Sequence, residues 1–175
     1  MSSANAWLLE CSGQLTIAAG DHEIIECIQA QGEQQVPLAP DYCNSVLVWQ
    51  NRPVPIFDLG LAIGLGDEGY ANSLVCLLNY QLAPRQPLQQ LALRVRETPE
   101  KVFVDDAQAI ASIDVPGNGL LDEVTLACFR HGQQPVAVID IARLCSRDFS
   151  DAVQARALAL FPGESADESS QVDSR

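Results

Sequence analysis

One short pattern occurs twice in this chain, 82 positions apart, and it constrains the fold more than any other feature. Residues 53–59 read PVPIFDL and residues 135–141 read PVAVIDI, so each copy is an apolar strand that ends at an aspartate. Each copy follows another apolar run across a few polar residues, 50–52 in the first case and 130–134 in the second. This arrangement predicts two β-hairpins. Because the unit occurs twice, we expect two related subdomains rather than a solenoid of many repeats.

The composition limits what such a pair of subdomains could do. The chain has 175 residues, 47% of them hydrophobic, enough for one large domain or for two small subdomains that share a core. Its net charge of −13, with only ten lysines and arginines, argues against nucleic acid and anionic membrane surfaces as partners. No apolar run approaches the roughly 20 residues that span a bilayer, and the first residues lack the features of a signal peptide. We therefore expect a cytoplasmic protein without direct membrane insertion.

The residues that most often carry chemistry are scattered. No two of the six cysteines have the CxxC spacing of zinc and redox sites, and most of them lie in apolar runs. His22 and His131 have no cysteine or histidine neighbour at ligand spacing. The chain also lacks a G-x-S-x-G elbow, a P-loop and a G-x-G-x-x-G motif after a strand. We expect buried free thiols, no metal site, no cofactor and no catalytic residues.

Many short strands with turn signals between them, and one convincing helix, predict a mainly all-β fold. We expect strands throughout residues 7–145, after frayed residues 1–6, with a subdomain junction near residues 64–72. A helix over residues 146–162 follows, and the acidic, serine-rich residues 163–175 are expected to be disordered. The pattern favours two small antiparallel barrels or sandwiches around a shared core. The residues expected to dock the helix on its own barrel are Phe149, Val153, Ala157 and Leu160.

The aspartates at the two strand ends, Asp58 and Asp140, allow two interpretations. Aspartic proteases use two close aspartates on related halves, which share a proton. That architecture has threonine or serine and then glycine after each aspartate, whereas Leu59-Gly60 and Ile141-Ala142 follow here. Alternatively, each aspartate accepts hydrogen bonds from the backbone of the turn that follows its strand. We favour structural caps and keep an aspartyl hydrolase as the lesser alternative.

Several segments together resemble the CheW-like domain family, which comprises the chemotaxis coupling proteins. The family pattern runs V-x-E-I, a proline-led segment, G-V-x-N-L-R-G and then P-V-x-D-L. It is similar to residues 24–27, 37–42, 45–51 and 54–59 of this chain, and residues 136–144 continue the resemblance. The resemblance spans roughly residues 7–145. It implies two five-stranded, SH3-like antiparallel β-barrels around a shared hydrophobic core, followed here by the C-terminal helix.

The same resemblance implies a role and its partners. Family members are non-catalytic adaptors that bind the regulatory domain of a CheA-type histidine kinase and the cytoplasmic tips of chemoreceptors. We therefore expect an adaptor of a chemosensory system, without enzymatic activity, and favour a system that controls pilus-driven motility rather than flagella. The alternative is a degenerate CheW-like module that has lost the kinase and binds a different protein.

The departures from the family pattern fall in turns and in the strands that face partners. The strand glutamate falls on Glu26, but residues 48–51 read VWQN in place of N-L-R-G, and Arg52 follows. Ser45 replaces the glycine that opens the central hairpin, and an insertion occurs around residues 84–90. A strand carboxylate is often merely solvated, and a tryptophan is more often a core anchor than an interface residue. The residues that we expect to contact protein partners are Glu26, Val48, Trp49, Gln50 and Arg52.

Overall fold

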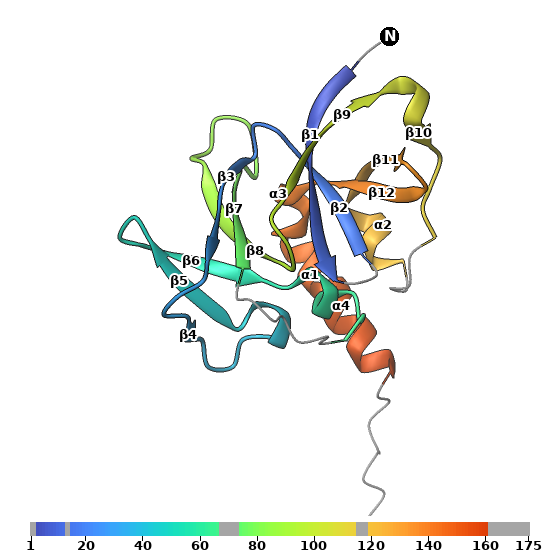
Figure 1. Ribbon diagram of the computed structural model, residues 1–175. Helices are drawn as coiled ribbons and strands as arrows, with labels where there is room; N and C mark the ends of the chain where they lie inside the picture. Colours follow the sequence, from blue (N-terminus) through green and yellow to red (C-terminus); the bar gives the residue numbers. More distant parts are fainter. Residues whose placement is uncertain (1–2, 13–14, 67–73, 115–118, 161–175) are drawn as a thin grey trace, which may run out of the picture.

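The computed structural model describes residues 3–12, 15–66, 74–114 and 119–160, and its fold is mainly β (Figure 1). The strands are β1 (Ser3–Ser12), β2 (Leu15–Gly20), β3 (Ile24–Gln29), β4 (Gln34–Gln35), β5 (Ser45–Trp49), β6 (Arg52–Phe57), β7 (Leu74–Tyr80), β8 (Gln89–Val95), β9 (Glu100–Asp105), β10 (Ala109–Ile110), β11 (Thr125–His131) and β12 (Gln134–Ile139). The helices are η1 (Asp41–Cys43), α1 (Leu59–Ala62), η2 (Asp106–Gln108), α2 (Leu120–Val124), α3 (Ile141–Leu144) and α4 (Arg147–Leu160). Both predicted hairpins are present, as β5–β6 and β11–β12.

The strands form two curled six-stranded sheets of the same order. One runs β4-β5-β6-β8-β7-β3 and the other runs β10-β11-β12-β2-β1-β9. Each sheet therefore has a two-residue strand, the repeated hairpin, a second hairpin and a last strand, in matching positions. The two related barrels that the sequence predicts are confirmed, with five longer strands each and one short strand at the edge.

Along the chain, the strands of the first barrel lie between two groups of strands that together form the second barrel. Strands β3–β8 form the first barrel, whereas the second barrel joins the N-terminal hairpin β1–β2 to strands β9–β12. In each barrel the two hairpins meet through one parallel contact, at Phe57 with Leu93 and at Val138 with Ala18. All other strand pairings within the described residues are antiparallel. The parallel contact arises because the joined strands come from separate segments and not from one hairpin.

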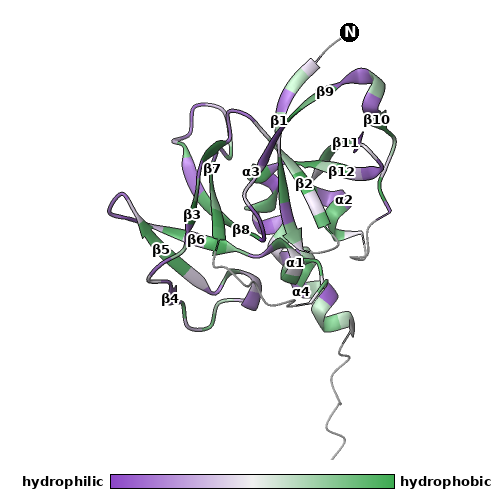
Figure 2. Ribbon diagram, in the orientation of Figure 1, coloured by the Kyte–Doolittle hydropathy of each residue, from purple (hydrophilic) through white to green (hydrophobic). Residues whose placement is uncertain are grey.

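The main hydrophobic core lies between the barrels, and each barrel has a smaller interior cluster of its own. Figure 2 shows hydrophobic residues concentrated on the strands and hydrophilic residues at the hairpin tips and loops. The shared core takes side chains from both hairpins and from the helices, including Leu9, Ile17, Phe57, Leu59, Leu93, Ile139, Ile141 and Phe149. Leu47, Val54 and Ile56 belong to the interior of the first barrel. The alternation of strand residues predicts this division, because successive side chains face opposite sides of a sheet.

Helix α4 ends the described chain, and the buried side chains among its described residues belong to its first half. Phe149 and Val153 are buried, whereas Ala157 is exposed and the side chain of Leu160 lies outside the described residues. The Phe149 ring lies 6.4 Å from that of Phe57, so the helix covers the shared core. The predicted docking stripe is therefore correct for one half of the helix and wrong at Ala157.

Three expectations concern the chain ends and the subdomain junction: one is wrong, and the other two fall wholly or mostly outside the described residues. The expectation of fraying up to residue 6 is wrong, because β1 begins at Ser3, which pairs with Asp105 of β9. The predicted acidic tail, residues 163–175, lies outside the described residues. So does most of the predicted junction at residues 64–72, because the description stops at residue 66 and resumes at residue 74.

Candidate functional site

The turn of the first repeated hairpin holds two side chains in an unfavourable backbone conformation. Gln50 and Asn51 have φ angles of 49° and 62°, and the residues on either side, Trp49 and Arg52, pair across the hairpin. Positive φ at both central residues is the type I′ arrangement, in which asparagine followed by glycine is preferred. A glutamine there carries strain of the kind that persists mostly where function requires it. Arg52 is the first residue of β6 rather than part of the turn.

Closure of the first barrel brings two of the predicted contact residues together. The indole Nε1 of Trp49 donates a hydrogen bond of 2.5 Å to Oε1 of Glu26, although β3 and β5 lie at separate positions in the sheet. The Trp49 ring is half-buried against the interior cluster of the barrel, and Glu26 is exposed. Trp49 is therefore a core anchor and a surface group at once. Among the described residues, no lysine or arginine forms an ion pair with Glu26.

Val48 and Arg52 lie near Trp49, and their side chains lie on opposite faces of the β5–β6 hairpin. Val48 points away from the barrel interior and is 62% exposed, directly opposite the exposed Pro53. Arg52 is exposed, and it has no acidic partner among the described residues. We call Glu26, Val48, Trp49, Gln50 and Arg52 the hairpin surface. It combines the Glu26 carboxylate, which Trp49 connects to the hairpin, with an exposed guanidinium and an exposed valine next to the strained turn.

The second barrel also contains a tryptophan that donates to a carboxylate, at a position that is not equivalent in the sheet and that the sequence analysis did not predict. Trp7 Nε1 donates a hydrogen bond of 2.8 Å to Oδ1 of Asp21, and Lys101 Nζ lies 2.8 Å from the same oxygen. The Lys101 ammonium also lies 5.6 Å from the centre of the Trp7 ring. Hydrogen bonds from Lys101 and Trp7 lower the pKa of Asp21 below its ordinary value. The carboxylate is thus already matched by a cation, unlike Glu26.

Asp58 and Asp140 occupy equivalent positions and make equivalent hydrogen bonds. Asp58 Oδ1 accepts from Leu61 N at 2.9 Å, and Asp140 Oδ1 accepts from Arg143 N at 3.0 Å. Their own backbone N–H groups donate to Tyr42 O at 2.7 Å and to Val124 O at 2.8 Å. Each carboxylate thereby caps the one-turn helix that follows its strand, α1 or α3, in the way the capping interpretation expects.

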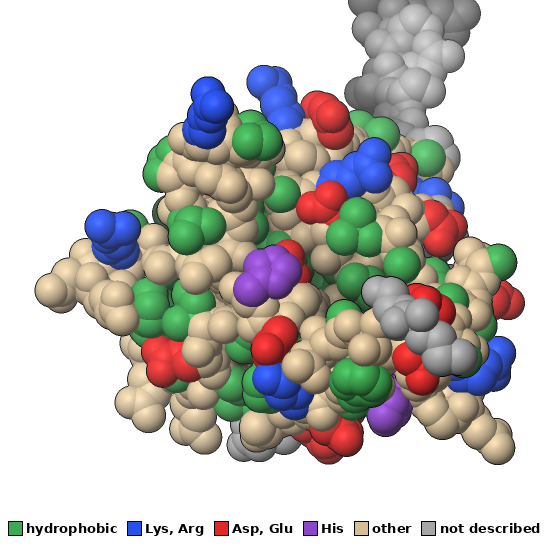
Figure 3. All heavy atoms as spheres, turned by 90° about the horizontal axis from the view of Figure 1, so that it is seen from above, with side chains coloured by type: hydrophobic (Ala, Val, Ile, Leu, Met, Phe, Trp, Pro, Cys, Tyr) green, Lys and Arg blue, Asp and Glu red, His purple; other side chains and the backbone are tan. Residues whose placement is uncertain are grey.

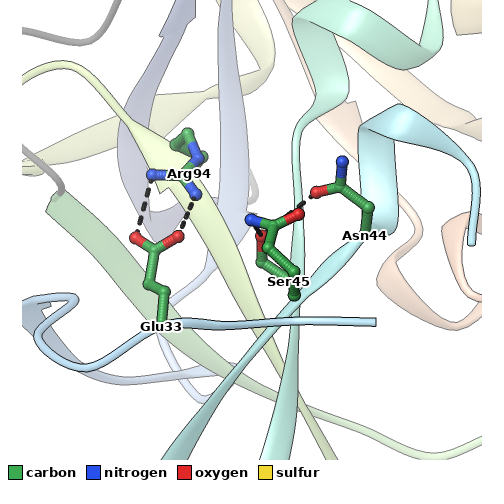
Figure 4. A network of polar contacts seen from close by, with 5 residues as sticks. Glu33, Asn44, Ser45 and Arg94 are labelled. Atoms are coloured by element: carbon green, nitrogen blue, oxygen red, sulfur yellow. Dashed lines mark hydrogen bonds and ion pairs between the residues drawn. The ribbon is translucent and has the colours of Figure 1, made fainter. Parts of the chain in front are cut away.

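The first barrel also contains a mostly buried ion pair that the sequence analysis did not predict. Arg94 of β8 donates to both carboxylate oxygens of Glu33, at 2.8 and 3.2 Å, and the two side chains are only 16% and 19% exposed (Figure 4). Beside it, the buried Ser45 hydroxyl donates to Asn44 Oδ1 and accepts from Gln35 Nε2. Ser45 therefore fits where the family has glycine, because its hydroxyl is fully hydrogen-bonded. The available signal for the ion pair was an arginine in an otherwise buried strand, which requires an acidic partner.

A cleft of about 280 Å³ lies between the first barrel and α4. Its walls are mostly apolar and include Tyr42, Phe57 and Phe149, with the thiols of Cys43 and Cys145 among them. Burial raises the pKa of all six cysteines, that of Cys145 to about 12, so the thiols stay protonated at neutral pH. Within the described part of the chain, no group of three or more histidine, cysteine, aspartate or glutamate side chains could hold a metal ion.

Among the described residues, the face of the molecule seen from above shows no broad area of a single charge sign (Figure 3). Seen from above, hydrophobic side chains lie scattered among polar atoms, and acidic and basic groups are interleaved (Figure 3). In the described ranges, no helix is both long and apolar enough to cross a membrane. A surface of this kind suits contacts made by a few local anchors rather than by a large charged patch.

Comparison with known proteins agrees with this architecture. A protein-family model described as the CheW-like domain matches residues 7–149. The chain is also similar to a solved structure, the scaffolding protein TtCheW from Thermoanaerobacter tengcongensis, with a TM-score of 0.61 and 12% sequence identity. That match covers 79% of this chain and 90% of the other chain, and at this identity it supports the fold alone. A comparison with proteins of curated function finds no significant match.

Proposed function

Because the chain belongs to the CheW-like domain family, we propose that it is a non-catalytic adaptor that couples chemoreceptors to a CheA-type histidine kinase. The family assignment supports a chemotaxis scaffold, and the kinase regulatory domain and the receptor tip are the partners that we propose for it. The hairpin surface is the proposed contact region. We further propose that the system controls pilus-driven motility.

The open carboxylate of Glu26 is the observation that carries this proposal. Trp49 fixes the orientation of the carboxylate through a 2.5 Å hydrogen bond but leaves its charge unpaired within the described residues. Tryptophan is enriched at protein interfaces, and an oriented, exposed charge beside it gives specificity for a partner of opposite charge. The strained turn at Gln50 adds a second reason, because strain of this kind clusters at sites of recognition.

Such an adaptor acts by holding its two partners in fixed positions relative to each other. The two barrels share one core, so a partner bound to the hairpin surface is held at a fixed distance from a partner bound elsewhere. A small movement of the receptor then changes the relative free energies of the active and inactive kinase states. No proton transfer or covalent step is required, and Asp58 and Asp140 stay in their capping roles.

The test is a titration with the CheA-type regulatory domain and the receptor tip encoded by the same genome. We expect the wild type to bind both partners with Kd values in the micromolar range, about −8 kcal/mol. Glu26→Gln should weaken binding to at least one partner about tenfold, whereas Asp21→Asn, which changes the matched pair in the second barrel, should not. If neither partner binds at tens of micromolar, the adaptor proposal is wrong.

One observation favours the alternative of a degenerate module with a different partner. Gln50 stands in the turn where the family pattern has its arginine, and Arg52 lies on the strand that follows. A Gln50→Arg variant separates the two readings. If the wild type does not bind the kinase domain and the variant does, the chain has lost this partner and serves another one. If both bind equally, the missing arginine has no bearing on kinase coupling.

A further inference from the structure

The loop between β7 and β8 exposes two leucines that belong to none of the hydrophobic clusters. Leu82 is 46% exposed and Leu88 is 64% exposed, and the exposed prolines Pro84 and Pro87 lie between them. This is also the region of the insertion relative to the family pattern. Leu88 lies within residues 84–90, where the resemblance to the family pattern indicates an insertion, and Leu82 lies just before it.

The loop is ordered by its own hydrogen bonds. Gln86 N donates to Ala83 O at 3.1 Å, and the Gln81 side chain donates to Gln86 O across the loop. In this turn Pro84 holds the second position and Arg85 the third, with φ of 71°. That is the type II pattern, in which glycine is strongly preferred at the third position. The chain thus keeps a strained arginine at the tip of a stiffened loop.

The loop lies in a stretch of the sequence whose charged residues are all basic, although the protein as a whole is acidic. The chain has 23 acidic residues, yet none of them lies within residues 69–96, where the only charged side chains are three arginines. Arg94 and Arg96 form ion pairs with Glu33 and Glu10. Arg85 is exposed, and no carboxylate among the described residues pairs with it. A partner at this loop therefore gains from carrying negative charge.

We propose that this loop, residues 81–88, is a second docking surface, which binds an amphipathic helix of a partner protein through its apolar ridge and flanking carboxylates. Such a helix presents apolar side chains every three or four residues, with charged residues along both sides. It would cover Leu82 and Leu88 and place a carboxylate near Arg85. The hydrogen bonds and prolines of the loop reduce the entropy lost on binding, because the leucines are already held in place.

The experiment uses two fluorescein-labelled helical peptides of about five turns with the same leucine ridge. One peptide has glutamates beside the ridge, and the other has lysines at the same positions. We expect the full-length protein to bind the glutamate peptide at least about tenfold more tightly than the lysine peptide. The double variant L82S/L88S and the variant Arg85→Gly should each weaken that binding about tenfold or more. Arg85→Gly should also melt at the same or a higher temperature, because glycine accepts positive φ, so lost binding cannot be lost folding.

Matched controls lie on the second barrel. Leu126 is 62% exposed and Arg130 is exposed, both on β11, so Leu126→Ser and Arg130→Gln change similar side chains away from the loop. Neither should alter peptide binding. The proposal is overturned if the two peptides bind equally, if neither binds below about 1 mM, or if the loop variants and the controls behave alike. None of these outcomes depends on whether the kinase or the receptor binds the hairpin surface.

Discussion

The two barrels have the same strand order, but their turns are built from different residues. The β5–β6 turn places Gln50 and Asn51 at positive φ, whereas the matching β11–β12 turn has Gly132 at 60°. Among the described residues, the four non-glycine residues with positive φ all belong to the first barrel: Leu38, Gln50, Asn51 and Arg85. In the described part of the second barrel, Gly119 and Gly132 hold this conformation. The first barrel thus keeps side chains where glycine would be more stable.

The two barrels also differ in the carboxylate to which each tryptophan donates its hydrogen bond. Trp7 donates to Asp21, whose charge is matched by Lys101, whereas Trp49 donates to Glu26, whose charge is unmatched among the described residues. The charge of Asp21 is thus balanced by a lysine of the same chain, whereas the charge of Glu26 is available to a partner. This difference supports our proposal that partners bind to the first barrel, where the charge of Glu26 is unmatched among the described residues.

The largest expected contrast concerns the ion pairs. Arg94→Ala should lower the free energy of unfolding by about 2 to 3 kcal/mol, because Glu33 is left mostly buried and without its cation. Lys101→Ala in the second barrel should have a much smaller effect, because both members of that pair are over 40% exposed. Urea unfolding at pH 7 measures both. Equal losses would show that the Glu33–Arg94 pair is not a special support of the first barrel.

A smaller contrast is expected between the two capping aspartates. Asp58 is 5% exposed and Asp140 is only half-buried. Asp58→Ala should cost about 2 kcal/mol and Asp140→Ala about 1 kcal/mol, the upper and middle of the range for lost N-caps. Asp58→Ser, which keeps an acceptor, should recover part of the loss. If the serine variant is no more stable than the alanine variant, capping is not what Asp58 contributes.

The turns provide a test with opposite signs. Gln50→Gly should stabilise the protein by about 1 kcal/mol, because glycine adopts positive φ without strain. Gly132→Ala should destabilise it by a similar amount of about 1 kcal/mol through φ alone, since no atom lies within 4 Å of the added Cβ. Thermal unfolding measures both shifts. If Gln50→Gly stabilises the protein and also weakens partner binding, the strain serves recognition; if binding is unchanged, it does not.

The local pattern was enough to predict the units of this fold but not their pairing. The repeat of Pro53 to Asp58 at Pro135 to Asp140 predicts both hairpins, because alternation and turn residues act over a few positions. That β1–β2 joins the C-terminal strands is a long-range choice, which no local signal encodes. The contact of Trp49 with Glu26 likewise depends on the closure of the first barrel, so the sequence predicts both residues as candidates but does not predict that they touch.

The smallest expected effect is the loss, at low pH, of the contribution that Asp21 makes to the stability of the folded state. Its pKa is lowered below the ordinary value of 3.8, chiefly by the hydrogen bond from Lys101 and then by that from Trp7. A carboxyl with a lowered pKa in the folded state stabilises that state above its unfolded pKa. This contribution is lost as the pH falls through the folded pKa. Asp21→Asn should therefore be slightly less stable than the wild type at pH 6, and the difference should shrink as the pH falls below about 3.8 and vanish below the folded pKa.

The neighbouring Glu23 provides the control, because its pKa is shifted the other way. Burial raises that pKa above the ordinary value of 4.5, in the same β2–β3 turn. A raised pKa gives a contribution that is present below pH 4.5 and lost as the pH rises through the folded value. Urea midpoints of the wild type, Asp21→Asn and Glu23→Gln between pH 2.5 and 7 should thus diverge in opposite directions. If Asp21→Asn shows no pH-dependent difference, the Trp7, Asp21 and Lys101 cluster is not the closed counterpart of Trp49 and Glu26, and the contrast between the barrels rests on the turns alone.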